Sequence, residues 1–276
     1  MDGLVQIKRP VVRYHGGKWK LAPWIISHFP DHGKYVESFG GGANVLLQKP
    51  RSEHEVYNDL DDGIVNLFRV LRDPAMSARL RELLDATPYA RNEFYDSYVP
   101  SADPVESARK TMVRAWMSIS SVGVCRRSRT GFAIDEVAVK RYQGVKENII
   151  AVAERMRGVL IEHRPAIQVI EYHDANDTLH YCDPPYVPDT RSSMGGGVYQ
   201  HEMTDDDHAK LAETLHSLKG MVILSGYPCD LYDEELFADW HRVERPHLAD
   251  GARKRIEVLW VNDAVRSKLT QPNLYD

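Results

Sequence analysis

A strand-like segment that ends in an acid, two prolines and a tyrosine is the strongest chemical signal in this 276-residue sequence. Residues 179–182 read LHYC, and the chain continues as Asp183-Pro184-Pro185-Tyr186. Because proline fixes φ and lacks an N–H, the segment must leave a sheet as a rigid, extended loop. The Asp183 carboxylate and the Pro184 carbonyl are then two acceptors beside an aromatic ring. This set suits a planar group that carries an NH₂.

A glycine run follows an earlier strand pattern, and an acid ends the next one. The strand expected over residues 35–39 leads into Phe39, Gly40, Gly41 and Gly42, and the strand expected over 55–59 ends at Asp59. Glycines at such a turn let backbone N–H groups approach a ligand, and an acid in this position accepts from both ribose hydroxyls. Together they predict an adenosine-containing cofactor. The run has neither GxGxxG nor P-loop spacing.

These residues need a sheet to position them, and strand and helix patterns alternate in the required way. We expect helices over 20–29, 43–48 and 63–71, and further strands over 159–162, 167–171, 179–183, 221–225 and 256–261. Between them, helical patterns dominate, over 75–84, 106–118 and 145–157. The predicted fold is α/β, with residues 1–72 and 158–276 forming the sheet domain and 73–157 a mostly helical insertion.

Charge separates the same two parts. The chain has 35 Lys and Arg against 40 Asp and Glu, a net charge of −5. Residues 105–157 carry 11 basic against 5 acidic side chains, so this segment is +6 and the remainder −11. A basic insertion on an acidic body favours a local contact with a polyanion. If that polyanion is a nucleic acid, we expect Arg126, Arg127 and Arg129 to contact its phosphates or guanine edges, and the helical trio Arg109, Lys110 and Arg114 to face its phosphates.

Composition excludes several other classes of protein. The three cysteines are far apart, the first residues have no apolar stretch, and no run approaches 18 apolar residues. We therefore expect an intracellular, cytoplasmic protein without disulfides or a membrane span. The acids of residues 205–207 fit the first turn of a helix capped by Thr204 better than a metal site. No metal is predicted.

In its ordered motifs the chain resembles the Dam-like (D12 class) DNA adenine-N6 methyltransferases of bacteria and their phages. The motifs are YHGGK at 14–18, FGGG at 39–42, the acid at 59 and DPPY at 183–186. The resemblance implies a Rossmann-like methyltransferase sheet, an inserted target-recognition domain and S-adenosylmethionine as methyl donor. It also implies that Tyr14 and Lys18 contact the cofactor, that Asp59 holds its ribose, and that the glycine run lines its methionine part.

The same resemblance implies transfer to the N6 amino group of adenine in double-stranded DNA, at a short site, after base flipping. Asp183, Pro184, Pro185 and Tyr186 would form the catalytic site, with Asp183 shared between cofactor and target. Arg191 and Tyr199 flank a glycine-rich segment that would lie over the flipped base. Members often have an acid before the catalytic strand that contacts the cofactor's adenine. Here residues 162–166 read EHRPA, which leaves this contact unassigned.

Other functions stay open at this stage. The same fold acts on cytosine N4 in DNA, on adenine in RNA or on glutamine in proteins, although Asp183 favours DNA over the last two. A non-catalytic DNA-binding relative, or a small-molecule enzyme with another adenosine cofactor, is a further alternative. A separate restriction endonuclease that shares the site is a candidate partner.

Overall fold

The computed structural model describes residues 7–124, 130–187, 190, 201–248 and 254–270. In these residues a 7-stranded sheet has the order β3-β2-β1-β4-β5-β7-β6. Strands β1 to β5 pair in parallel, whereas β7 runs antiparallel to both β5 and β6. The bounds are β1 Lys34–Glu37, β2 His54–Asn58, β3 Leu160–Glu162, β4 Thr178–Cys182, β5 Met221–Gly226, β6 His241–Leu248 and β7 Lys254–Val261. The predicted α/β architecture is confirmed.

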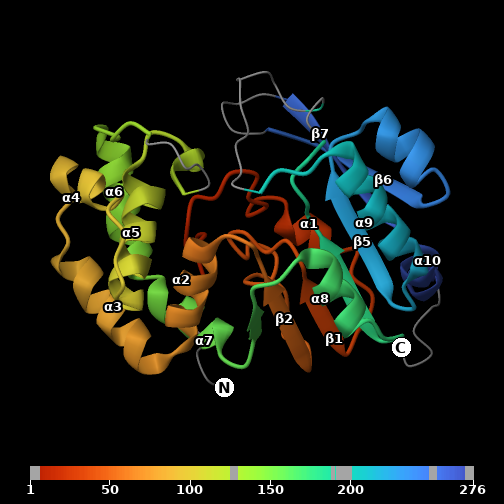
Figure 1. Ribbon diagram of the computed structural model, residues 1–276, viewed down its shortest axis with the longest axis horizontal. Helices are drawn as coiled ribbons and strands as arrows, with labels where there is room; N and C mark the ends of the chain where they lie inside the picture. Colours follow the sequence, from red (N-terminus) through yellow and green to blue (C-terminus); the bar gives the residue numbers. More distant parts are fainter. Residues whose placement is uncertain (1–6, 125–129, 188–189, 191–200, 249–253, 271–276) are drawn as a thin grey trace.

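Helices lie against the sheet and beside it. Figure 1 shows α8 and α9 in front of the strands, and α3 to α6 gathered at one side. A capping box at Thr204 starts α9, as the sequence predicts. The bounds are α1 Ala22–Ile26, α2 Asp62–Arg72, α3 Pro74–Ala86, α4 Arg91–Asp96, α5 Pro104–Met117, α6 Glu136–Lys146, α7 Ile149–Met156, α8 Ala166–His173, α9 Asp205–Ser217 and α10 Asp263–Thr270.

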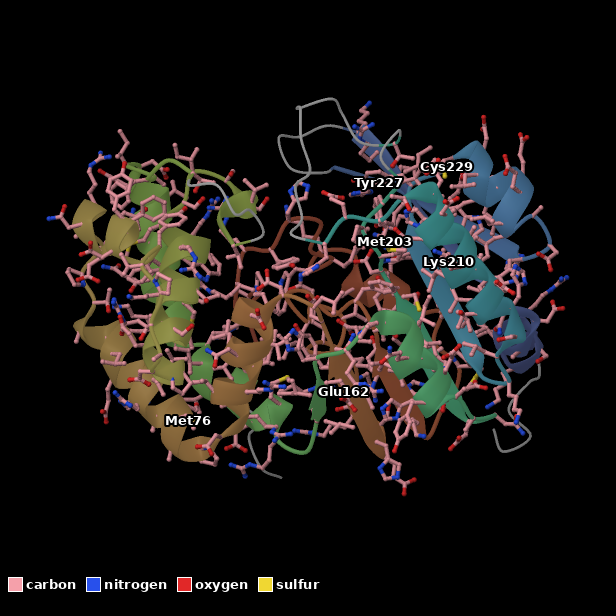
Figure 2. All side chains as sticks on the ribbon, in the orientation of Figure 1. Met76, Glu162, Met203, Lys210, Tyr227 and Cys229 are labelled. Carbon is pink, nitrogen blue, oxygen red and sulfur yellow. The ribbon has the colours of Figure 1, made fainter. Side chains whose placement is uncertain are left out.

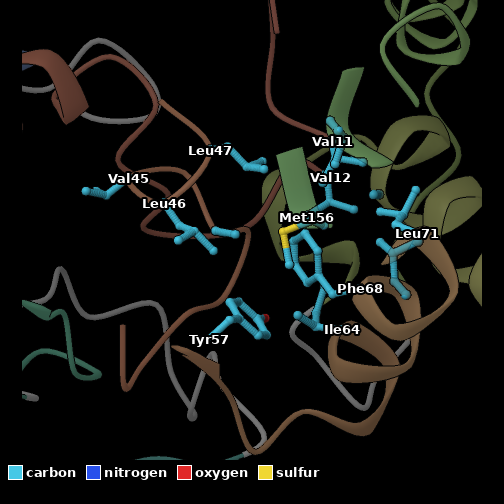
Figure 3. Packing of buried hydrophobic residues seen from close by; sticks show 14 of the residues in the cluster. Val11, Val12, Val45, Leu46, Leu47, Tyr57, Ile64, Phe68, Leu71 and Met156 are labelled. Carbon is cyan, nitrogen blue, oxygen red and sulfur yellow. The ribbon is translucent and has the colours of Figure 1, made fainter. Parts of the chain in front are cut away.

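One apolar core joins the sheet to the helices at its side. Tyr57 of β2 packs its ring on Phe68 of α2, with ring centroids 4.7 Å apart, and Met156 of α7 lies in the same cluster (Figure 3). The cluster continues into α3 and α6 through Leu80 and Tyr142. The helices between residues 73 and 157 therefore share their core with the sheet, and the predicted domain division stays a prediction.

Two predicted elements are wrong. Residues 43–48 form turns, because Ala43 has φ of +52°, in the left-handed region that a right-handed helix excludes. Residues 167–171 belong to helix α8, because the short apolar run packs a helix onto the sheet instead of adding a strand. The helix predicted over 145–157 is two helices, α6 and α7, separated at Asn148, whose side chain bonds backbone atoms of residues 8 and 9.

The basic trio on α5 does not face outward as predicted. Arg109 donates to Glu106 and to Glu93 at 2.7 Å, and its side chain is only 12% exposed. Lys110 donates to the Val99 carbonyl, and Arg114 to that of Ser97. Because α4 and the segment after it fold onto α5, these cations are bound within the protein, and the prediction that they face phosphates is wrong.

A buried ion cluster fastens α7 to the sheet. Both oxygens of Glu55 on β2 accept from Arg155, at 2.6 and 2.8 Å, and Lys49 donates to Glu55 at 2.8 Å. Arg155 also donates to the Leu46 carbonyl, beside the glycine run. The Glu55 side chain is 3% exposed, so removal of one cation leaves a buried charge with half its partners.

We expect Arg155→Met to lower the free energy of unfolding by about 2–4 kcal/mol, because Glu55 loses both bonds to the guanidinium. Arg157→Met is the matched control, since Arg157 pairs with Glu154 at the exposed surface, and we expect it to cost less than about 0.5 kcal/mol. Urea unfolding measures both variants. Equal losses in the two would contradict the assigned role of the buried cluster.

Candidate active site

The predicted site residues meet at one end of the sheet. In the parallel arrangement β2-β1-β4-β5, the carboxyl ends of all four strands reach the same edge. The register pairs Glu37 of β1 with Tyr181 of β4, so the glycine run and Asp183 emerge side by side. The strand order reverses between β1 and β4, the position at which open α/β sheets bind ligands.

A cleft of about 1570 Å³ opens at this edge. It exceeds the usual volume of a pocket for one small ligand, so it has room for a cofactor and a substrate group together. Met203 and Tyr227, both labelled in Figure 2, belong to its lining. The described site residues of the sequence prediction all line it: Tyr14, Lys18, Phe39, Gly40, Gly41, Gly42, Asp59, Asp183, Pro184, Pro185 and Tyr186.

Packing explains the glycines in the run. A Cβ added at Gly40 would lie 2.2 Å from Cε2 of Tyr57, a fully buried ring. Gly41 has φ of +46°, and its carbonyl accepts from the Tyr57 hydroxyl at 2.7 Å. The Gly40 N–H donates to the Asn58 carbonyl at 2.7 Å. The chain therefore turns tightly against β2, which leaves its outer side open to the cleft.

Asp59 connects the glycine run to the start of α2. One carboxylate oxygen accepts from the Gly41 N–H at 2.7 Å, and the other accepts from the Asp61 N–H at 2.8 Å. Burial raises the pKa of Asp59, while these backbone N–H groups lower it. Asp61 caps α2, and its burial beside Asp59 raises its pKa to about 6. Each Asp59 oxygen keeps capacity for a second donor from the cleft.

Asp183 lies in a network of buried polar groups. Its Oδ1 accepts from the Ser225 hydroxyl of β5 at 2.9 Å and is 2.9 Å from the Lys18 Nζ. Lys18 is 5% exposed and also donates to the Gly16 carbonyl at 2.9 Å. Burial lowers the pKa of Lys18, but the carboxylates of Asp183 and Glu257 raise it by more. Lys18 is therefore a buried, charged ammonium group.

Glu257 of β7 completes the network, although it was not among the site residues predicted from the sequence. The Tyr186 hydroxyl donates to its Oε1 at 2.5 Å, and the Lys18 Nζ lies 3.6 Å from the same oxygen. Burial raises the pKa of Glu257 to about 7, against the lowering effect of Lys18. The Tyr186 and Tyr227 rings pack edge to face, with centroids 4.6 Å apart. The Lys18 ammonium lies over the Tyr186 ring, 4.7 Å from its centroid.

Several residues that line the cleft carried no individual sequence signal. Arg255 and Glu257 come from the antiparallel strand β7, and Tyr227 follows β5. A carboxylate near the start of the strand expected over 256–261 predicts no partner by itself. Its role depends on Lys18, about 240 residues earlier in the chain.

The DNA-binding predictions fall partly outside the described residues. Arg126, Arg127, Arg129, Arg191 and Tyr199 all lie there. The loop that carries the first three begins and ends at a described bridge between Ser118 and Phe132, next to the end of α5. Besides Lys18, the cations that line the cleft are Arg13, Lys20, Arg141, Lys210 and Arg255.

The cleft fits an adenosine cofactor with an amino-acid tail. Asp59 offers a carboxylate for a ribose, and Pro165, Ala166 and Ile167 supply an apolar wall near it. The Asn44 Oδ1 is buried in the lining and has no hydrogen-bond partner, which leaves an acceptor for an ammonium group. Of the stretch 162–166, Pro165 and Ala166 line the cleft and Glu162 does not, so the contact to the adenine of the cofactor stays unassigned.

Two absences apply to the described part of the chain. Its helices include none with the length and apolar character needed to cross a membrane. Its His, Cys, Asp and Glu side chains form no group of three or more that could hold a metal ion.

Glu37, the last residue of β1, is a further buried acid whose pKa is raised. Burial raises the pKa of Glu37 to about 8, while bonds from the Tyr35 hydroxyl at 2.6 Å and the Leu46 N–H at 2.9 Å lower it. The folded protein therefore holds this proton more tightly than an unfolded chain. Stability from Glu37 is complete below its ordinary pKa and is lost as the pH rises through about 8.

We expect Glu37→Gln to match the wild type in stability near pH 5 and to exceed it by about 2–4 kcal/mol near pH 9, because the amide never has to ionise in the core. Urea unfolding at the two pH values measures the difference. Glu53→Gln removes an exposed acid just before β2 and is the matched control, expected to show no such pH dependence. A pH-independent effect of Glu37→Gln would contradict the assignment.

Comparison with known proteins points to one family. Residues 14–249 match the D12 class N6 adenine-specific DNA methyltransferases. A DNA adenine methylase of Serratia marcescens is 24% identical over 283 residues, covering 95% of this chain and 96% of the relative. The Type II methyltransferase M.MjaIII of Methanocaldococcus jannaschii is 24% identical over 234 residues, covering 76% and 80%. A DNA adenine methylase of Escherichia coli (strain K12) is 22% identical over 270 residues, covering 91% and 94%.

Proposed function

Because the chain belongs to the D12 class of N6 adenine-specific DNA methyltransferases, we propose that S-adenosylmethionine is its methyl donor and that transfer to adenine takes place in the cleft at Asp183. The observation that carries this proposal is the convergence of Asp59, the glycine run and Asp183 on one edge of the sheet. The predicted family membership and adenine-specific DNA methylation are confirmed by the family match.

The described residues divide the cleft into two parts. Asp59, Asn44 and the glycine run suit the ribose and amino-acid tail of the donor, which supplies an electrophilic methyl group on a sulfonium when bound. Asp183, Pro184 and Tyr186 suit the base. The Asp183 carboxylate and the Pro184 carbonyl accept the two N–H bonds of the adenine amino group, which concentrates electron density on a weak nucleophile. Their fixed positions also orient the nitrogen toward the methyl.

A paired adenine in a duplex cannot reach this depth. Asp183 is half-buried and Pro184 buried, so we propose that the target base is flipped out of the helix, at a cost of a few kcal/mol of unstacking. The Tyr186 ring, held by its hydroxyl bond to Glu257, supplies a face on which the base stacks. The RRSR loop, with Arg126, Arg127 and Arg129, stays our proposal for contact with DNA, together with Arg191 and Tyr199.

Binding of the donor tests the first part of the proposal. Isothermal titration with S-adenosylmethionine in the absence of DNA should give one site per chain, weakened about 10-fold or more by Asp59→Ala. Asp62→Ala, an exposed acid in the first turn of α2, is the matched control and should leave affinity unchanged. Lack of binding by the wild type, or equal effects of the two variants, would contradict the proposed cofactor site.

A link to restriction is a separate proposal. The Methanocaldococcus jannaschii relative is named a Type II methyltransferase. If a separate endonuclease shares the site of this chain, plasmid from cells that express the chain will resist that endonuclease, whereas plasmid from cells with Asp183→Ala will be cut.

A further inference from the structure

Lys18 already contacts Oδ1 of Asp183, the carboxylate that the proposed function gives to the target amino group as an acceptor. Its ammonium contacts Asp183 Oδ1 at 2.9 Å and lies 4.7 Å from the centre of the Tyr186 ring. Asp183 is the acceptor proposed above for the adenine amino group, and the Tyr186 ring is the face proposed for stacking of the base. Oδ1 already accepts from the Ser225 hydroxyl and the Lys18 ammonium, which uses both of its lone pairs, so an amino group that binds this oxygen in place of the ammonium must displace the lysine. This step rests on the proposed function of the cleft.

A displaced ammonium needs another partner, because it is buried. The Gly16 carbonyl at 2.9 Å keeps one of its donors in place. Glu257 Oε1 is 3.6 Å away, an ion pair that is too long for a good hydrogen bond. A movement of less than about 1 Å would bring the ammonium to the 2.7–2.9 Å of a charged hydrogen bond. Glu257 is 1% exposed, so this second partner for the ammonium is itself buried.

We propose that Glu257 is a positioning residue that receives Lys18 when the target adenine enters, and so frees Asp183 for the amino group. In the absence of DNA, Lys18 pairs with Asp183 and keeps its Oδ1 bonded to an internal donor. During base binding, the ammonium passes from Asp183 to Glu257 and stays paired throughout. Glu257 acts through Lys18 and has no contact with the reacting atoms.

The first test needs neither DNA nor activity. In a crystal structure of Asp183→Asn without DNA, the ammonium has lost its nearest anion, and we expect the Lys18–Glu257 distance to shorten from 3.6 Å to below 3.2 Å. A lysine that stays beside position 183, with Glu257 still out of hydrogen-bond range, would overturn the proposal. This result is independent of whether the protein methylates DNA.

The second test is a double-mutant cycle on DNA affinity. The probe is a duplex carrying the site that the wild type modifies, with an abasic position opposite the target adenine, so that base pairing does not oppose entry. We expect Glu257→Gln to raise the Kd by about 10- to 100-fold, because the displaced ammonium has no buried anion. In the Lys18→Met background, the same change should alter the Kd less than about 2-fold.

An effect of Glu257→Gln that is equally large in both backgrounds would overturn the proposal, because Glu257 would then act through Tyr186 or through the fold. Glu244→Gln, an exposed acid on the neighbouring strand β6, is the matched control for loss of a negative charge. If the wild type modifies no DNA, the proposed function fails, and the Asp183→Asn structure alone decides whether Lys18 transfers to Glu257.

Discussion

Replacement of Asp183 by alanine is expected to lower the rate of methyl transfer to DNA by about 100- to 1,000-fold, the usual effect of losing one preorganised group that stabilises a transition state. The carboxylate is the charged acceptor that the proposed site assigns to the adenine amino group. Without it, the nitrogen loses both electron density and orientation. Donor affinity should fall much less, because Asp59 and the glycine run are untouched.

Single-turnover transfer of a labelled methyl group to DNA measures this effect, and calorimetry measures donor binding in the same variant. Asp177→Ala is the matched control. Asp177 is an exposed acid that directly precedes β4, whereas Asp183 directly follows it. We expect it to keep the wild-type rate. More than about a tenth of the normal rate in Asp183→Ala would place the chemistry elsewhere.

The second large effect is expected from a single added methyl group. In Gly40→Ala, the new Cβ would lie 2.2 Å from Cε2 and 2.5 Å from Cδ2 of Tyr57. The ring cannot retreat, because it is fully buried against Phe68. The glycine run must therefore move outward into the cleft. We expect a loss of stability of about 1–3 kcal/mol, and donor binding weakened about 10-fold or more.

Gly158→Ala separates this clash from a general effect of the substitution. Gly158 has φ of +85°, with nothing within 4 Å of an added Cβ, and it lies outside the cleft lining. The variant should lose about 1 kcal/mol through backbone strain and keep its donor affinity. Urea unfolding and calorimetry report both quantities. Normal donor affinity in Gly40→Ala would contradict the assignment of the glycine run to the cofactor.

The sequence was informative where local chemistry and strand order agree. The glycine run, Asp59 and Asp183 each follow a strand, and parallel pairing brings all three to one edge without further information. The family resemblance added Tyr14 and Lys18, which the structure places in the same cleft.

Long-range packing decided what could not be predicted. The run IQVIE at 167–171 is too short to distinguish a buried strand from a helix, and packing against the sheet selected α8. Arg109 looked like a surface cation until α4 placed Glu93 beside it. Strand β6 was missed because its sequence, HRVERPHL, carries charges and a proline, which are uncommon in strands. It forms a strand because its backbone pairs with β7 along its length.

Glu257 shows the same limit within the site. Its carboxylate meets Lys18 and Tyr186 because β7 inserts antiparallel beside β5, a register that no local pattern encodes. Burial then shifts the pKa of Glu257, and this environment marks it as a functional candidate. The sequence alone places an acid at the start of a strand and no more.

Nucleoside analysis of the product tests the central claim most directly. DNA from a host without methylation is incubated with the protein and S-adenosylmethionine carrying a labelled methyl group, digested to nucleosides and analysed by mass spectrometry. The predicted result is label in N6-methyldeoxyadenosine, abolished by Asp183→Ala. Label in N4-methyldeoxycytidine, or equal N6 labelling by wild type and variant, would contradict adenine transfer at Asp183.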